Sequence, residues 1–317
     1  MTTNHGHPSV VSLNVPVFRD EQGQVFLRIG LIMTLYFHRG TSADTRIRVG
    51  ECLDLFRALA GKNLRFMTNQ SGTRWQRLEE QRILEFKKTL QSTLPAPQSW
   101  EFACQGGVNA HEASEFQFSV FGNGAVDRLS YLRVVLPMTW LQTPQGSFPD
   151  LVEQFCRILG PYHGYGGFGF IESNDIEMEY YGEPMVYALS RRFPGIEVDR
   201  PLVHLMYLSD GIKGVNWLTV LGPRWIEQMG GVAALRTALP DPFVFREFDQ
   251  GLIIQAGPAP EIGDCNQQLW PAFYPKLARL LKPIRIQQHG CFDYAGTHRF
   301  TPETTMEWLT RFDRDPW

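Results

Sequence analysis

The thirteen residues Val25-Phe-Leu-Arg-Ile-Gly-Leu-Ile-Met-Thr-Leu-Tyr-Phe37 are the most apolar run near the start of the chain. The run is rich in branched and aromatic residues, which favour a β-strand. It contains Arg28 and is shorter than the ~20 apolar residues that a membrane-spanning helix needs. The run therefore predicts a long buried strand and not a membrane span.

Both helices and strands are predicted on the C-terminal side of this strand. Apolar residues at helical spacing predict a helix over residues 46–60, with Gly61 as its C-cap. A strand over 62–68 and a charged helix over 74–91 follow. Residues 100–140 change to an alternating pattern, which predicts a hairpin of strands 116–120 and 129–136 around the turn Gly122-Asn123-Gly124.

The second half of the chain continues to mix helices and strands. Pro149 suits the first position of a helix over 149–159. Further patterns predict strands at 166–171, 202–208 and 284–287, helices at 184–192, 216–230 (broken at Pro223), 232–239, 270–281 and 302–312, and a hairpin of 243–247 with 251–255. We expect an α+β fold with mixed or antiparallel sheets, hairpins and amphipathic helices. We expect one domain over 1–317, in which two subdomains, about 12–148 and 149–300, can be drawn.

Composition excludes several classes of protein. The chain has 317 residues, 43% of them hydrophobic, so it can build a large core and is not a disordered protein. Its net charge is −3, whereas a general nucleic-acid binder is usually basic. The N-terminus lacks the basic and apolar regions of a secretory signal, and the 5 cysteines form no C-x-x-C pair. We therefore expect a cytoplasmic protein that binds neither membrane nor nucleic acid directly.

Motifs of known chemistry are incomplete. Residues 164–169 fit G-x-G-x-x-G, but a helix is predicted before them and a strand after them, the reverse of a dinucleotide site. His289, Cys291 and His298 could contribute to a metal or thiol site only with a fourth ligand from elsewhere. We expect no catalytic residue, no metal and no cofactor. A metal- or thiol-dependent enzyme with a site at these three residues remains the alternative.

Charge is segregated along the chain. Between Arg157 and Arg191 there is no Lys or Arg, and 5 acidic residues give a local balance of −5. This stretch also holds 7 Phe and Tyr residues. Carboxylates attract a basic partner and aromatic rings provide buried contact area. The candidate partner-binding residues are Tyr165, Glu172, Asp175, Glu177, Glu179, Tyr180, Tyr181 and Glu183.

Two alternatives to this acidic interface remain open. The stretch can be a solvated acidic face with aromatic residues in the core. Between Arg39 and Lys88 the local balance is +5, so the basic helix predicted over 74–91 could instead bind an acidic partner.

Three further stretches are unusual enough to indicate a family. They are ALSRRFPGIEVD at 188–199, GIKGVNWLTVLG at 211–222 and GLIIQAGP at 251–258. Together they resemble the type VI secretion immunity family whose members neutralise VRR-Nuc nuclease effectors. The resemblance extends from the strand at Val25 to about Ile286.

This resemblance implies a function in binding and not in catalysis. It implies an immunity protein that binds a cognate effector toxin, a VRR-Nuc-type nuclease, and blocks its active or DNA-binding surface. The free protein would be a monomer or a homodimer. Gly211 and Gly214 suit a turn and Trp217 a core position, so this motif does not locate the interface. A structural component of the secretion apparatus remains a third possibility, which predicts large assemblies.

Overall fold

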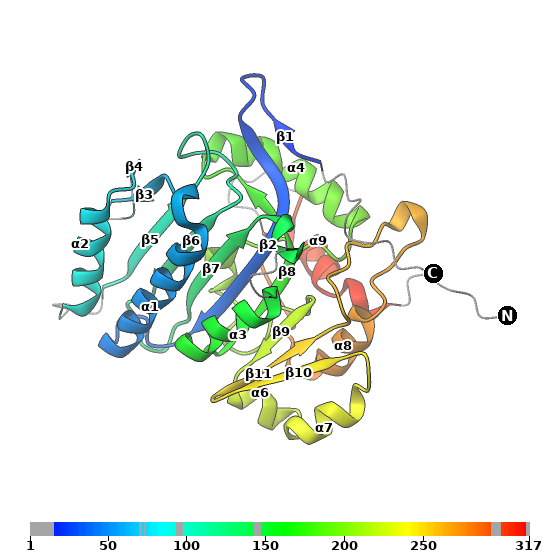
Figure 1. Ribbon diagram of the computed structural model, residues 1–317. Coiled ribbons are helices and arrows are strands. Elements are labelled where there is room, and N and C mark those ends of the chain that lie inside the picture. The colour runs from blue at the N-terminus through cyan, green and yellow to red at the C-terminus, as the bar shows by residue number, and fades with distance from the viewer. Residues whose placement is uncertain are drawn as a thin grey trace.

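A computed structural model describes residues 16–69, 72, 74–92, 98–142, 147–292 and 299–314. Within these residues all strands join one open sheet in the order β10-β11-β9-β8-β2-β7-β6-β5-β3-β4, with β1 beside β2. Each pair of neighbouring strands is antiparallel. The expected α+β fold is confirmed, and Figure 1 shows the sheet with its helices.

The bounds of the elements follow the chain. The strands are β1 Phe18–Arg19, β2 Val25–Phe37, β3 Phe66–Thr68, β4 Trp75–Arg77, β5 Trp100–Gln105, β6 Gln117–Gly122, β7 Ser130–Leu136, β8 His163–Glu172, β9 Leu218–Leu221, β10 Val244–Phe248 and β11 Gly251–Gln255. The helices are α1 Ala43–Ala60, α2 Glu80–Gln91, α3 Phe148–Leu159, α4 Ile176–Arg192, α5 Pro201–His204, α6 Pro223–Gln228, α7 Gly231–Ala238, α8 Tyr274–Leu281 and α9 Pro302–Leu309.

The quoted strand β2 lies at the centre of the sheet. It pairs with β7 on one side and with β8 on the other, so it joins the first half of the chain to the second. Its side chains are almost all buried, because elements cover both of its faces. This is why its apolar run is nearly continuous and does not alternate.

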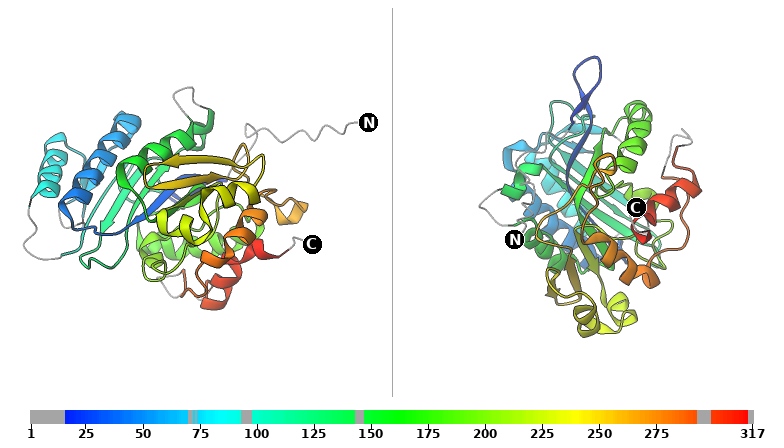
Figure 2. Two further views of the ribbon diagram at one scale, coloured as in Figure 1. Left: turned by 90° about the horizontal axis from the view of Figure 1, so that it is seen from below. Right: turned by 90° about the vertical axis from the view of Figure 1, so that its right-hand side faces the viewer.

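Helices lie on both faces of the sheet. Phe56 of α1 contacts Phe118 of β6 with ring centroids 5.7 Å apart, and Phe86 of α2 stacks on Phe102 of β5 at 4.0 Å. Figure 1 shows α1 and α3 in front of the sheet, and the right-hand view of Figure 2 shows α4 on the opposite side. The strands β3, β5, β6 and β7 therefore have a helix-covered face and an opposite face that α1 and α2 do not cover.

Two strand predictions are wrong. Residues 202–208 begin as helix α5, because Pro201 occupies its first position and the backbone N–H groups of His204 and Leu205 bond back to Arg200 and Pro201. Residues 284–287 contribute only an isolated bridge between Ile212 and Arg285. The apolar residues that suggested strands include buried ones in both segments, Val203 and Leu205 in the first and Ile284 and Ile286 in the second, and burial favours apolar side chains whatever the backbone conformation.

Three helix predictions are also corrected. The first part of the helix predicted over 74–91 is strand β4, because Trp75 to Arg77 pair with β3, and helix α2 begins only at Glu80. The helix predicted from 216 contains strand β9 instead, and helix α6 begins at Pro223. Pro184 lies inside helix α4, which begins at Ile176 after an Asp175 N-cap. In the first two segments, pairing with neighbouring strands overrides the local helical pattern. In the third, an N-cap residue upstream of the predicted start lets the helix begin earlier.

Some predictions fall outside the described residues. They concern residues 1–15, where a signal was sought, and His298. In the part of the chain that is described, no helix is both long and apolar enough to cross a membrane.

Candidate functional site

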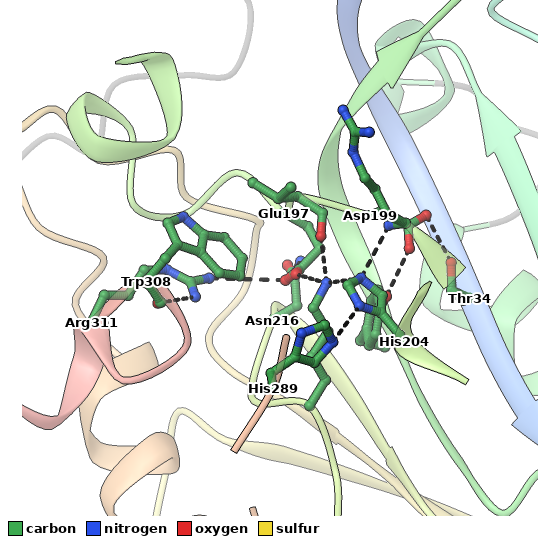
Figure 3. A network of polar contacts seen from close by, with 12 residues as sticks. Thr34, Glu197, Asp199, His204, Asn216, His289, Trp308 and Arg311 are labelled. Carbon is green, nitrogen blue, oxygen red and sulfur yellow. Dashed lines mark hydrogen bonds and ion pairs between the residues drawn. The ribbon is translucent and has the colours of Figure 1, made fainter. Parts of the chain in front are cut away.

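A buried carboxylate lies behind the centre of the sheet. Asp199 accepts hydrogen bonds from Thr34 Oγ1 at 2.9 Å, from Arg133 Nε at 2.6 Å and from Tyr165 OH at 2.7 Å (Figure 3). Tyr36 OH lies 3.3 Å from Tyr165 OH and is the donor of that pair, because the Tyr165 proton is already used. These donors come from β2, β7 and β8, so Asp199 ties three central strands together.

A second buried carboxylate pairs with a buried lysine. Glu197 Oε1 lies 2.7 Å from the Lys213 ammonium, and its other oxygen accepts from Asn216 Nδ2 at 3.3 Å. The side chains of Glu197 and Lys213 are 4% and 2% exposed. Burial lowers the pKa of Lys213, and the charges of Glu197 and Asp199 oppose that shift. A buried ion pair of this kind needs both partners.

Two histidines continue the network from Lys213. His204 Nε2 accepts from Lys213 Nζ at 2.7 Å and from the Arg200 N–H at 3.0 Å, so the proton of the neutral ring is on Nδ1. His204 Nδ1 then donates to His289 Nε2 at 3.1 Å, and His289 Nδ1 donates to the Gly290 carbonyl at 2.9 Å. Burial lowers the pKa of both rings, that of His289 to about 4, with Lys213 adding to the shift.

The same network decides what His289 can do. Both of its ring nitrogens have hydrogen-bond partners inside the protein, so neither is free to bind a metal. Cys291 is exposed. Among the described residues, no three His, Cys, Asp or Glu side chains are placed to hold a metal ion. Nothing in this part of the molecule supports the alternative of a metal- or thiol-dependent enzyme.

The three unusual sequence stretches meet in this network. Glu197 and Asp199 belong to the first stretch and Lys213 to the second. Trp217, also in the second, donates its indole N–H to the Gly257 carbonyl in the third at 3.1 Å. Residues of all three stretches therefore contribute to one buried polar core.

The acidic stretch forms the end of β8 and the helix α4. Asp175 is the N-cap and accepts from the Glu177 N–H at 2.9 Å. Glu177 and Glu179 lie in the first turn, where negative charge is favoured by the helix dipole, and Arg191 and Arg192 lie in the last. The pattern of charge along the sequence thus also explains why this helix forms here.

The eight predicted contact residues are placed in three different environments. Tyr165 and Glu183 are in the interior, 2% and 1% exposed. Glu172 and Glu179 both pair with Arg200, the former at 2.6 Å. The others lie at the surface, and they are Asp175, Glu177, Tyr180 and Tyr181.

A groove lies beside α4, on the face of the sheet that α1 and α2 leave uncovered. We call it the sheet-face groove; its volume is about 600 Å³. Small side chains of adjacent strands form its floor, Ala103 on β5 and Ser119 on β6, which face one another in the register. It is bounded by Trp75, Glu101, Tyr131, Arg133, Glu172, Glu179, Arg200 and Leu202.

The sequence analysis missed this groove. The signal was present in the alternation of β5, where Phe102 and Cys104 point to the helices and Glu101, Ala103 and Gln105 point away from them. Alternation shows that a strand has a polar face, but not which polar faces adjoin. Arg200, on the opposite side of the groove, is far from β5 in the sequence, so no local pattern predicts that the two lie together.

Some basic side chains of the alternative interface pair with carboxylates of the protein itself. Arg82 pairs with Glu79 at 3.0 Å, and Lys87 of the same helix pairs with Asp54 at 2.5 Å. Arg57 pairs with Glu80 at 2.5 Å. These basic side chains are thus already partnered within the protein.

Comparison with known proteins gives a family match and a structural match. Residues 48–312 match the model of the TsiV family, described as type VI immunity for VRR-NUC. The fold is similar to that of the Pseudomonas aeruginosa T6SS protein PA0821, with a TM-score of 0.83 and 25% sequence identity over 93% of this chain and 86% of that one. No curated protein sequence matches the chain.

Proposed function

Since this chain belongs to the type VI immunity family for VRR-Nuc, we propose that it neutralises a VRR-Nuc effector by binding it through the acidic face of α4. The observation that carries the proposal is that Glu177, Tyr180 and Tyr181 are exposed on one helix. The sequence from 158 to 190 contains no Lys or Arg. Tyr180 and Tyr181 are 52% and 65% exposed. Large aromatic side chains at a surface commonly mark interaction sites.

Electrostatics favours a nuclease as the partner. An enzyme that binds a polyanion presents a basic surface to the phosphates. An acidic helix attracts that surface and competes with the nucleic acid for it. Binding there blocks the active or DNA-binding surface without any chemistry by the immunity protein.

Several finer properties belong to the same proposal. We infer stoichiometric binding without catalysis, in the cytoplasm, where an incoming nuclease would reach DNA. The protein would act as a single domain, a monomer or homodimer when free, and would not bind nucleic acid itself. The sheet supports action as one unit because β2 pairs with β8 across the two expected subdomains.

Co-expression tests the proposal directly. The product of the neighbouring gene, or a candidate VRR-Nuc effector, would be produced in the bacterial cytoplasm with and without the protein, followed by co-purification. We expect killing without the protein, survival with it and recovery of a one-to-one complex. Survival without a complex would reject direct neutralisation, and very large assemblies would favour an apparatus component.

A charge reversal tests the contribution of α4. Glu177→Lys should slow association with the effector roughly tenfold at low salt, with little effect at high salt, because a long-range attraction is screened. The matched control is Glu51→Lys, an exposed carboxylate on α1 at the opposite face. Association rates from surface plasmon resonance would measure both. Equal rates for the two variants would remove α4 from the interface.

A further inference from the structure

We propose that the sheet-face groove is a docking site for an extended basic segment of the effector, with Glu101 as the carboxylate that pairs with an incoming arginine or lysine. This inference rests on the proposed function and adds a second contact region to α4. Three features of the described residues support it: the shape of the groove, its unbalanced charge and the apolar side chains at its rim.

The shape results from the side chains on neighbouring strands. Ala103 and Ser119 are directly opposite one another, and Ser119 is opposite Arg133 on the next strand. In the adjacent row, Phe121 stacks on Tyr131 with ring centroids 6.3 Å apart. Small residues beside a row of rings leave a trough across the strands. Such a trough fits an extended segment with a long side chain better than it fits a compact ligand.

The charges in the groove are only partly neutralised. Four carboxylates and two guanidinium groups line it, a balance of −2. Arg133 is held by Asp199 at 2.6 Å, and Arg200 pairs with both Glu172 and Glu179. Both cations are thus already satisfied, so the groove has no free positive group to attract an anion.

Glu101 is the groove carboxylate that has no ion-pair partner among the described residues. Its side chain is exposed on the open face of β5, and no residue that the structure describes makes an ion pair with it. Partial burial raises its pKa, because burial disfavours the charged form of the carboxyl group. A cation placed beside it would relieve this cost. The chemistry that the groove lacks is therefore a basic side chain.

Apolar side chains at the rim provide contact area around this charge. Leu202 lines the groove and is 44% exposed, and Met206, four residues later, is 60% exposed. On the other side Trp75 lines the groove from β4. Apolar residues around a charged centre are a common arrangement at protein interfaces, because they exclude water from the ion pair.

Two variants test the charge and the shape separately. Glu101→Lys should reduce the association rate with the effector at least tenfold at low salt. Ser119→Phe places a ring on the floor, where a β-strand tolerates it, and should raise the dissociation rate about tenfold. Glu51→Lys on α1 is the control for net charge. Effector lacking nuclease activity would be the probe in surface plasmon resonance, and thermal unfolding would verify that each variant folds.

The outcomes distinguish this inference from the proposed function. If the unaltered protein does not bind the effector, the proposed function fails. If it binds, and Glu101→Lys behaves like Glu51→Lys while Ser119→Phe binds normally, the groove is not a contact but immunity stands. If a variant does not fold, Glu101→Gln replaces it and should weaken binding severalfold. Unchanged binding of folded Glu101→Gln would also overturn the inference.

Discussion

Lys213→Met should lower the free energy of unfolding by about 3–5 kcal/mol, the usual cost of breaking a buried ion pair by removing one partner. Methionine fills nearly the same volume, so the loss is electrostatic and not a cavity effect. In this variant the Glu197 carboxylate, which is 4% exposed, keeps only the hydrogen bond from the Asn216 amide and the Arg311 guanidinium at 3.9 Å. Urea denaturation followed by circular dichroism would measure the change.

A double variant identifies the cause of this loss. Glu197→Gln removes the orphaned charge and keeps an oxygen for Asn216, so Lys213→Met/Glu197→Gln should be less destabilised than the sum of the single variants by about 1–3 kcal/mol. The surface pair of Lys87 and Asp54 provides the control, since Lys87→Met should cost less than about 1 kcal/mol. Additive effects at Lys213 and Glu197 would contradict the ion-pair explanation.

The buried network also shows what sequence patterns can predict. The long strand β2 and both hairpins, β6 with β7 and β10 with β11, were predicted because each depends on local alternation or a local turn. By contrast, Thr34 and Asp199 are 165 positions apart, and no periodicity connects them. The three family stretches were recognised as sequence, but their meeting around Lys213 required the fold.

The predicted acidic interface illustrates a second limit. A count of charges along the chain treats Glu183 and Glu177 alike, although the first is 1% exposed and the second is at the surface. Likewise Tyr165 was expected at a partner surface, but its hydroxyl serves Asp199. Charge segregation therefore marks the segment as a candidate interface, and burial shows which of its members have structural roles and which are at the surface.

Acidification from pH 7.5 to 5 should destabilise the protein by several kcal/mol. Burial lowers the pKa of His163 to about 3 and that of His289 to about 4, and it lowers the pKa of His204 well below its usual value. In the unfolded chain these imidazoles bind protons near pH 6.5, so their contribution to the free energy of unfolding is complete above that pH. Their contribution is lost as the pH falls from about 6.5 toward each folded-state pKa.

His289→Gln isolates one ring from this effect. Glutamine has an acceptor for His204 and a donor for the Gly290 carbonyl but cannot be protonated, so the variant should retain much of the stability at pH 7.5. At pH 5 a pKa of about 4 against 6.5 corresponds to about 2 kcal/mol, and the loss between pH 7.5 and 5 should shrink by that amount. Urea midpoints at both pH values measure it. Carboxylates with lowered pKa, such as Asp313, lose their contribution only at lower pH. An unchanged loss in His289→Gln would therefore show that the fold does not lower the pKa of His289.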